Sequence, residues 1–248
     1  MDKTQHIGIT ETSDPAFHLD IFDNLKTGNI IITKSLTNKL IEKLVEYKSS
    51  CILHCTCTGM GGTKIEPFVP TVEQTVKKIE KLIDAGFPVK QIVLRIDPIV
   101  PTEKGVNTAK KVLIAFKNFG IERVRMSFLD MYQHVKERFN ENDIALPYET
   151  FHADSNTRHK AFTDLENLAK ELGYHQVLTC GEPGFVETPC ISQTDIDILG
   201  LTDKIILIGK KEQRTSCGCP QNKRELIPFK DRNEHKCGHG CLYCYMKD

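Results

Sequence analysis

The alternation of short apolar segments with amphipathic segments is the feature that most constrains the fold of this chain. Short apolar runs predict strands, and most are separated by segments with helical periodicity. The predicted strands are 6–10, 29–33, 51–58, 91–100, 123–129, 176–179 and 205–208, and the predicted helices are 15–25, 40–45, 72–85, 106–118 and 158–172. Such alternation is typical of parallel βα units. Because no Gly-rich phosphate fingerprint is present, we predict an α/β fold, a (β/α) barrel or partial barrel of parallel strands.

Local signals refine this outline. Thr71 and Gln74 have the spacing of a capping box for the helix that follows. The Gly/Pro-rich segment 59–70 is long for a loop, which suggests a functional role. The polar, poorly periodic segment 133–157 is predicted as a lid or variable loop. We expect the α/β domain to span 1–209 and an irregular, cysteine-rich tail, 210–248, to close it.

Composition and charge exclude several classes of protein. Of the 248 residues, 40% are hydrophobic and 27% charged, which is typical of a globular chain. The N-terminus does not resemble a signal peptide and no run of about 18 apolar residues occurs, so we predict a cytoplasmic protein without membrane contact. The net charge of 0 gives no general case for polyanion binding. Residues 204–236 do contain nine Lys/Arg against four Asp/Glu, either as a solvated face or as a basic surround for an anion.

Three of the ten cysteines form a compact motif at the C-terminus. Cys237, Cys241 and Cys244 have the spacing C-x3-C-x2-C, and Tyr243 precedes the third. Three thiolates on so short a loop suit three irons of a 4Fe–4S cluster and leave the fourth iron open. The pattern resembles the cysteine signature of radical S-adenosylmethionine (SAM) enzymes, although there the motif usually lies near the N-terminus. We therefore predict that these thiols bind a cluster and that Tyr243 contacts the cofactor.

The other seven cysteines fall into two groups. Four thiols are candidates for a second cluster or a zinc site, or are ordinary buried residues: Cys180, Cys190, Cys217 and Cys219. Cys217 and Cys219 are also candidates to join the tail in a tetrahedral zinc site. Cys51, Cys55 and Cys57 alternate along a predicted strand and are interpreted as apolar core. His54, between them, is expected to be a core residue with satisfied hydrogen bonds.

Polar residues follow the predicted strands at their carboxyl ends, where parallel α/β folds carry their chemistry. The candidates are Glu11, Lys34, Arg95, Asp97, Ser127, Asp130 and Glu182. Arg95 and Asp97 share one face of a strand, which suits either a structural ion pair or a site that holds SAM or substrate. Glu11 and Glu182 suit hydroxyl or amino groups, because a carboxylate accepts several hydrogen bonds. We expect catalytic or substrate roles for Arg95, Asp97 and Asp130, and cofactor contacts for the others.

Several of these elements together resemble an uncharacterised bacterial family, a domain of unknown function whose C-terminal cysteines are similar to those of radical SAM enzymes. The resemblance rests on the tail and on five upstream elements, Asp14–Phe17, Arg95–Ile99, Ser127–Tyr132, Thr179–Glu182 and Cys190–Ile191, with Gln213-Arg214 before Cys217. It departs from the family pattern at Ser192, where an Asp is expected, and before Asp14, where arginines are expected. The match spans most of the chain.

The resemblance implies a circularly permuted radical SAM barrel. The predicted strand 205–208 would lead into the cluster loop that elsewhere follows the first strand. The implied cofactors are a 4Fe–4S cluster and SAM, and the implied partner is a reducing electron donor of the flavodoxin or ferredoxin type. A nucleotide or nucleic-acid substrate has weak support from the local basic excess. The alternatives are a zinc-stapled binding protein and an iron–sulfur electron carrier without SAM chemistry.

Overall fold

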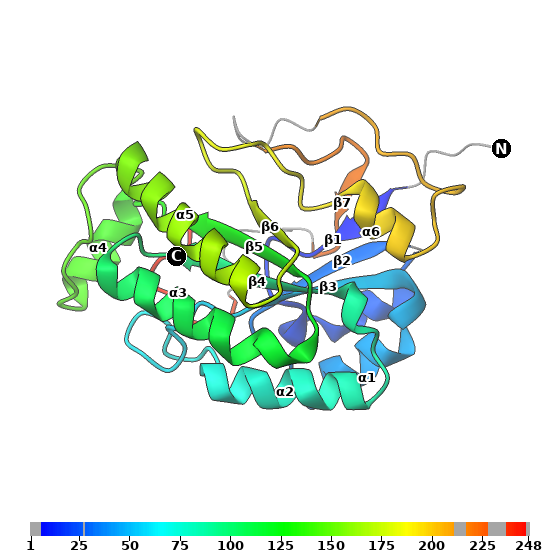
Figure 1. The fold of residues 1–248 in the computed structure, drawn as a ribbon. Coiled ribbons are helices and arrows are strands. Elements are labelled where there is room, and N and C mark those ends of the chain that lie inside the picture. The colour runs from blue at the N-terminus through cyan, green and yellow to red at the C-terminus, as the bar shows by residue number, and fades with distance from the viewer. Residues whose placement is uncertain (1–5, 27, 211–216, 228–236, 247–248) are drawn as a thin grey trace.

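One parallel sheet of seven strands organises the computed structural model (Figure 1), which describes residues 6–26, 28–210, 217–227 and 237–246. Its order is β6-β5-β4-β3-β2-β1-β7, so strands β1 to β6 lie side by side in chain order. The strands are β1 (Ile7–Ile9), β2 (Asn29–Thr33), β3 (Cys51–Thr56), β4 (Ile92–Ile99), β5 (Arg123–Phe128), β6 (Gln176–Thr179) and β7 (Lys223–Glu225). Every neighbouring pair is parallel. The predicted α/β class and the parallel sheet are therefore confirmed.

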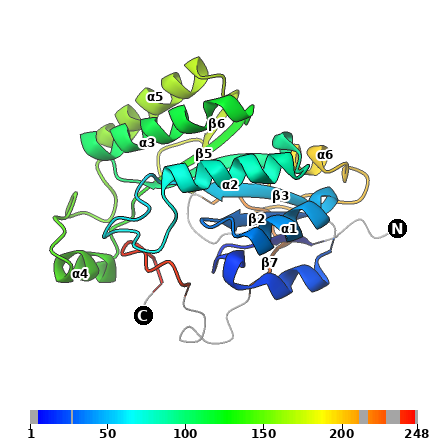
Figure 2. The same ribbon diagram turned by 90° about the horizontal axis from the view of Figure 1, so that it is seen from below.

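A layer of helices covers the outer face of the sheet (Figures 1 and 2). It consists of α1 (Asn38–Glu46), α2 (Val72–Asp84), α3 (Glu103–Phe116) and α5 (Ser155–Glu171). Their apolar stripes pack on alternate strand residues in the main core, which contains Cys51, Cys55 and Cys57 as predicted. The capping box of α2 is also confirmed, because Thr71 and Gln74 bond reciprocally. Single 3-10 turns are η3 (Lys48–Ser50), η4 (Val89–Gln91) and η5 (Lys117–Phe119).

The inner face of the sheet is covered differently. Here α6 (Gln193–Ile198) and its flanking chain pack on a second apolar cluster that includes Ile7, Ile9, Ile30, Ile52, Val93, Ile196 and Leu201. A buried ion pair links this cover to the sheet, since Arg123 Nη1 donates to Asp195 Oδ1 over 2.6 Å. Residues 180–210, which follow β6, thus lie over the inner face of the sheet (Figure 1). The two edge strands of the sheet are β6 and β7.

Three local predictions are wrong, and one helix was not predicted. Residues 205–208 form no strand. The seventh strand is β7 at 223–225, whose polar sequence lacks the apolar run on which strand prediction depends. The segment 133–157 contains a helix, α4 (Gln133–Glu141), because Val135 and Phe139 bury one face in a small separate core. The helix expected at 15–25 is two 3-10 helices, η1 (Pro15–Phe17) and η2 (Leu19–Asn24), and α6 has no predicted counterpart. Since β7 belongs to the sheet, the sheet crosses the predicted domain boundary at 209, which itself stays a prediction.

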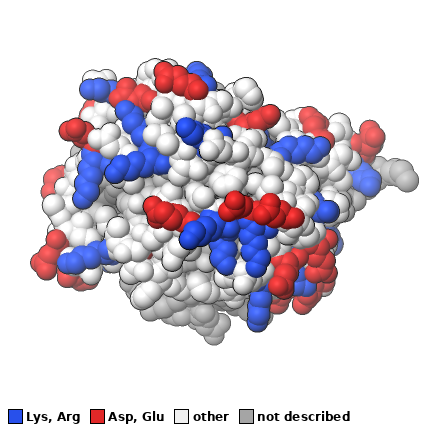
Figure 3. All heavy atoms as spheres, turned by 60° about the horizontal axis from the view of Figure 1, so that its bottom comes forward, with Lys and Arg blue, Asp and Glu red and all other residues white. Residues whose placement is uncertain are grey.

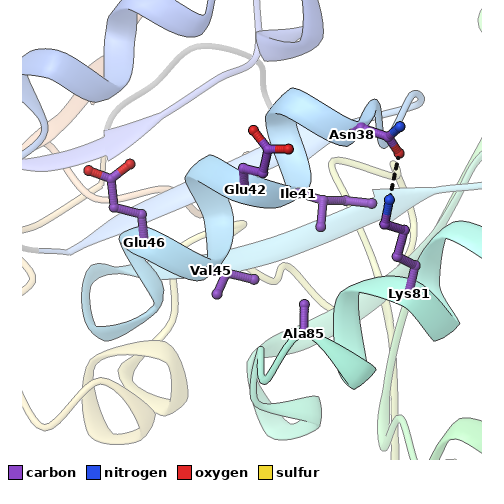
Figure 4. Close-up of a pocket in the computed structure, with 7 residues that line it drawn as sticks. All are labelled: Asn38, Ile41, Glu42, Val45, Glu46, Lys81 and Ala85. Carbon is purple, nitrogen blue, oxygen red and sulfur yellow. Dashed lines mark hydrogen bonds between the residues drawn. The ribbon is translucent and has the colours of Figure 1, made fainter.

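The surface carries few further signals. Lys and Arg are interspersed with Asp and Glu on the face in Figure 3. Within 204–236, four of the nine Lys/Arg and one of the four acids belong to the described residues, and the other five Lys/Arg and three acids lie outside them. In the described part of the chain, no helix is long and apolar enough to cross a bilayer. A groove between α1 and α2, bridged by the 3.1 Å bond from Lys81 Nζ to Asn38 Oδ1 (Figure 4), contains none of the predicted site residues.

Candidate functional site

Residues 237–246, called the cysteine tail from here on, lie against the loop 59–70 and α4, beside the carboxyl ends of the central strands (Figure 2). Its backbone is bonded to the loop, since Leu242 N donates to Ile65 O over 3.0 Å and Phe68 N donates to His239 O over 3.3 Å. From the other side, Arg138 Nη1 on α4 donates to Cys244 O over 2.7 Å. The long Gly/Pro-rich loop therefore has a definite role here, which is to hold the tail in place.

Asp14 anchors the tail to the first strands of the sheet. Its buried carboxylate accepts hydrogen bonds from Ala16 N (2.9 Å), Thr33 Oγ1 (2.6 Å) and Lys34 N (2.7 Å). The ring of His239, between the first two tail cysteines, reaches the same carboxylate through Nε2 over 2.7 Å. Its buried Nδ1 has no hydrogen-bond partner within the described part of the chain. Asp14 thus fixes the tail, and one ring nitrogen of His239 stays buried without a partner among the described residues, which is uncommon for a polar atom.

Two of the three tail thiols have raised pKa values, and the three sulfurs are not in contact as a set. Burial raises the pKa of Cys237, and it raises the pKa of Cys241 to about 12, so both thiols are protonated without a metal. Across the described residues, the three sulfurs do not all lie within 4.8 Å of one another. They therefore do not form a ready-made site for a single zinc ion, on which two thiolates would lie about 3.8 Å apart.

A charged network connects the tail to the rim of the sheet. Glu66, fully buried in the loop 59–70, accepts hydrogen bonds from Thr58 Oγ1 (2.6 Å), from Lys34 Nζ (3.2 Å) and from the Tyr243 hydroxyl. Lys34 Nζ also donates to Asp97 O over 3.2 Å. Although burial lowers the pKa of Lys34, its negative neighbours, Glu66 foremost, outweigh that effect and leave the pKa raised. Lys34 and Tyr243, predicted separately, are thus brought together by Glu66, which sequence reasoning missed.

Arg95, Asp97 and Ser127 form the next part of the rim, on β4 and β5. The Asp97 carboxylate accepts short hydrogen bonds from the Arg95 guanidinium and the Ser127 hydroxyl. Burial opposes ionisation of Asp97, but Arg95 and Ser127 favour the carboxylate and hold its pKa below the usual value. About a quarter of the Asp97 side chain remains exposed. This charged carboxylate is therefore held rigidly while part of its surface faces solvent.

Glu182 and Asp130 lie farther along the same rim. Glu182, after β6, accepts hydrogen bonds from Phe128 N (2.7 Å) and Arg158 Nη1 (3.2 Å). Burial nevertheless raises its pKa to about 7, and the nearby Asp130 carboxylate acts in the same direction. Asp130 itself pairs with His152 Nδ1 over 2.8 Å. Glu182 is thus a carboxyl group that changes charge near neutral pH.

Replacing Glu182 with Gln should flatten part of the pH dependence of stability. Because the folded-state pKa is raised, the contribution of Glu182 is full below its ordinary pKa of 4.5 and is lost as the pH rises through about 7. The Glu182→Gln variant should therefore gain stability relative to wild type by about 1–3 kcal/mol between about pH 5 and 8. Urea unfolding at both pH values measures this difference. The exposed Glu171→Gln control should have the same pH dependence of stability as wild type. If Glu182→Gln also kept the pH dependence of wild type, the raised pKa of Glu182 would be refuted.

A second group of thiols lies on the inner face, beside Arg95 of the rim. The Sγ atoms of Cys180 and Cys190 are 3.2 Å apart, and Cys190 N donates to the Cys219 sulfur over 3.2 Å. The sulfurs of Cys190 and Cys219 and a carboxylate oxygen of Glu11 all lie within 4.8 Å of one another. Arg95 Nη1 is 3.8 Å from the Cys190 sulfur. Glu11 thus lies with these thiols and with Lys223, whose Nζ is 2.5 Å from the Glu11 carboxylate. The Glu11 side chain does not join the rim network of the described residues.

Cys217 and His54 complete this inner region. Cys217 is half-buried and packs against the inner apolar cluster. His54 on β3 is fully buried, and neither ring nitrogen has a partner among the described residues. The prediction that His54 is satisfied is therefore wrong. Burial, together with Arg125 and Arg95, lowers the pKa of this imidazole well below its usual value, so it is a neutral ring.

Comparisons with known proteins identify the family of this chain but not its activity. No curated protein matches this sequence. Among solved structures, the lysine/ornithine decarboxylase of Vibrio vulnificus complexed with cadaverine aligns with 62% of this chain at 11% identity and a TM-score of 0.38. The aligned part is 40% of that structure, and so weak a likeness supports no inference.

The sequence does match the model of a protein family. The match covers residues 22–246, and therefore both the rim residues of β2 to β6 and the cysteine tail. The prediction of an uncharacterised family, a domain of unknown function, is confirmed, and the likeness to radical SAM enzymes stays a prediction. The predicted element Asp14–Phe17 precedes the matched range, and Gln213 and Arg214 lie outside the described residues. The chain is thus a member of DUF1848, a family described as a domain of unknown function.

Proposed function

We propose that this protein is a radical SAM enzyme. The observation that carries the proposal is the docking of a C-x3-C-x2-C loop onto the carboxyl-end rim of a parallel sheet, where charged side chains from several strands converge. In parallel α/β folds this edge is where ligands and reacting groups are held. The tail is therefore in the right place for a cofactor that the rim residues help to bind.

The strand order supports a permuted partial barrel. Because β7 lies outside β1, the spatial sequence of the sheet runs β7, β1, β2 and onward to β6. β7 is spatially the first strand although it is last in the chain, and the cysteine tail follows it in sequence. A cluster loop that follows the first strand of the barrel is the arrangement that the radical SAM resemblance implies. Its C-terminal position then follows from a different starting point of the chain around the same barrel.

The residues of the tail fit a 4Fe–4S cluster. Cys237, Cys241 and Cys244 would hold three irons, with each thiolate on a different metal atom. The buried Nδ1 of His239, which has no partner within the described residues, lies in the same loop and suits a polar contact with the bound group. Metal binding would also keep the half-buried thiols of Cys237 and Cys241 ionised, although burial raises their pKa values.

The rim residues have distinct roles in this proposal. A reduced cluster with SAM bound supplies a 5′-deoxyadenosyl radical, which abstracts hydrogen from a substrate. Lys34 and Arg95 provide positive charge for a carboxylate, and Asp97 and Glu182 accept hydrogen bonds from amino or hydroxyl groups. Tyr243 and Glu66 hold Lys34 in position. Ser127 orients Asp97, and Asp130 extends the rim toward the substrate.

Two partners complete the proposal. The electron comes from a reduced donor of the flavodoxin or ferredoxin type, as the resemblance to radical SAM enzymes implies. Nucleotides and nucleic acids are one substrate class to test, on the basis of the positive charge of residues 204–236.

An anaerobic experiment tests the function. The protein is purified without oxygen, its iron, sulfide and zinc are measured, and it is reduced with dithionite before SAM is added. We expect iron and sulfide in the ratio of a 4Fe–4S cluster, an electron paramagnetic resonance signal that changes when SAM binds, and formation of 5′-deoxyadenosine. The spectroscopic change does not require the substrate.

The alternatives predict other outcomes of the same experiment. A tail that contains zinc without sulfide would contradict the proposal and favour a zinc-stapled binding protein. A cluster whose spectrum ignores SAM would favour an iron–sulfur electron carrier.

A further inference from the structure

We propose that the inner face of the sheet contains a separate zinc site, formed by Glu11, Cys190 and Cys219 with Cys180 as the fourth ligand. Glu11 follows β1, Cys180 and Cys190 follow β6, and Cys219 precedes β7. The site shares no ligand with the cysteine tail. It therefore stands or falls independently of the proposed radical SAM function.

The distances between the donor atoms fit one metal ion. One carboxylate oxygen of Glu11 and the sulfurs of Cys190 and Cys219 all lie within 4.8 Å of one another. The Cys180 sulfur is 3.2 Å from the Cys190 sulfur. Zinc binds thiolates at about 2.3 Å in a tetrahedron, which places two such sulfurs about 3.8 Å apart. Three of the four donors are thus already grouped as one ion requires and Cys180 lies beside one of them, whereas an iron–sulfur cluster places each thiolate on a different iron.

The charge around these thiols also indicates an anionic centre. Arg95 Nη1 lies 4.0 Å from the Cys180 sulfur and 3.8 Å from the Cys190 sulfur, and Lys223 Nζ contacts Glu11. Arg125, also buried, donates to Thr188 Oγ1 over 3.3 Å and forms no ion pair within the described residues. A zinc ion with three thiolates and one carboxylate has a net charge of −2. Such a centre offsets buried cations that are otherwise costly to hold away from water.

The position of the site gives it a structural purpose. The sheet is open between β6 and β7, and no strand pairing connects these two edges. The four ligands come from both sides of this opening, two after β6 and two beside the β1–β7 edge. One zinc ion would thus tie together edges that backbone hydrogen bonds leave apart, and would hold the segment between them over the inner face.

Metal analysis of the full-length chain with the tail disabled tests the site. In the Cys237→Ser, Cys241→Ser, Cys244→Ser triple variant we expect about one zinc per chain and little iron. Adding Cys190→Ser and Cys219→Ser to this variant should remove the zinc. The matched control adds Cys51→Ser and Cys55→Ser, two buried thiols in the outer core, and should keep the zinc.

A variant of Glu11 tests the site without removing a buried thiol, so that loss of zinc can be distinguished from misfolding. Glu11→Gln should leave a folded protein by circular dichroism and weaken zinc binding about tenfold or more in competition with a chelator. Cobalt in place of zinc should give the visible bands of a tetrahedral ion and a thiolate charge-transfer band. These bands should shift in Glu11→Gln and be unchanged in the Cys51→Ser, Cys55→Ser control.

Three results would overturn the proposal. The first is a folded triple variant without zinc that also fails to bind added zinc or cobalt. The second is iron with sulfide in place of zinc in that variant, which would make the site an iron–sulfur centre. The third is a mass two daltons below the calculated value together with protection of Cys180 and Cys190 from alkylation, which would identify a disulfide. None of these results bears on SAM cleavage by the wild-type tail.

Discussion

Cys241→Ser should lose nearly all of its cluster iron and reduce 5′-deoxyadenosine formation at least about 100-fold, because residues that act as one unit fail together. Cys241 is the tail thiol nearest the charged network, since both Lys34 and Glu66 act on its ionisation. Its loss leaves two thiolates on a loop that needs three. Iron and sulfide assays and quantification of 5′-deoxyadenosine after dithionite reduction measure the effect.

Cys57→Ser is the matched control for this prediction. Cys57 is a buried thiol directly before the loop that holds the tail, but it belongs to the outer core. Its variant should keep the wild-type iron and sulfide content. Full activity in Cys241→Ser would show that the tail does not bind the reacting cluster, and equal loss of iron in both variants would point to a general loss of folding.

Asp14→Ala should produce the largest loss of stability among the site variants, about 3–5 kcal/mol, because it breaks a buried ionic and hydrogen-bonded network. The carboxylate accepts from the side chains of Thr33 and His239 and from the backbone N–H groups of Ala16 and Lys34. Its removal leaves these donors buried without a partner and detaches the first half of the tail. Urea unfolding gives the free energy, and iron content gives the effect on the tail.

The exposed Asp20→Asn variant is the control, since Asp20 lies in the neighbouring 3-10 helix η2 and changes the same charge at the surface. It should unfold within about 0.5 kcal/mol of wild type. A stable Asp14→Ala protein that still binds iron would mean that the loop 59–70 and α4 alone hold the tail. A less stable protein with normal iron would separate the role of Asp14 in folding from its role at the site.

The α/β pattern and the tail motif could be predicted because both are local. Strands such as Asn29–Thr33 and Gln176–Thr179 have the predicted bounds, since a buried parallel strand needs a short apolar run. The rim positions of Lys34, Asp97 and Ser127 could also be anticipated, because parallel strands end at one edge of a sheet. The helix within 133–157 was missed since its buried face has only two large apolar residues, Val135 and Phe139.

The residues that assemble the site were harder to predict. Asp14 and His239 are 225 residues apart and Glu66 and Tyr243 are 177 apart, yet each pair is joined by a hydrogen bond. Nothing in the spacing of the sequence signals such pairs. Glu11 illustrates the reverse case, because its position after β1 was predicted but its neighbours, Cys190, Cys219 and Lys223, were not.

The sequence by itself determined the chemistry that is available: a three-thiol loop, an alternation that requires a parallel sheet, and polar residues at the strand ends. These follow from covalent spacing and from the burial of short apolar segments. Only the tertiary structure decided which groups meet. It placed β7 beside β1, the tail on Asp14 and Glu66, and a second set of thiols on the inner face, because packing brings together residues that the chain separates.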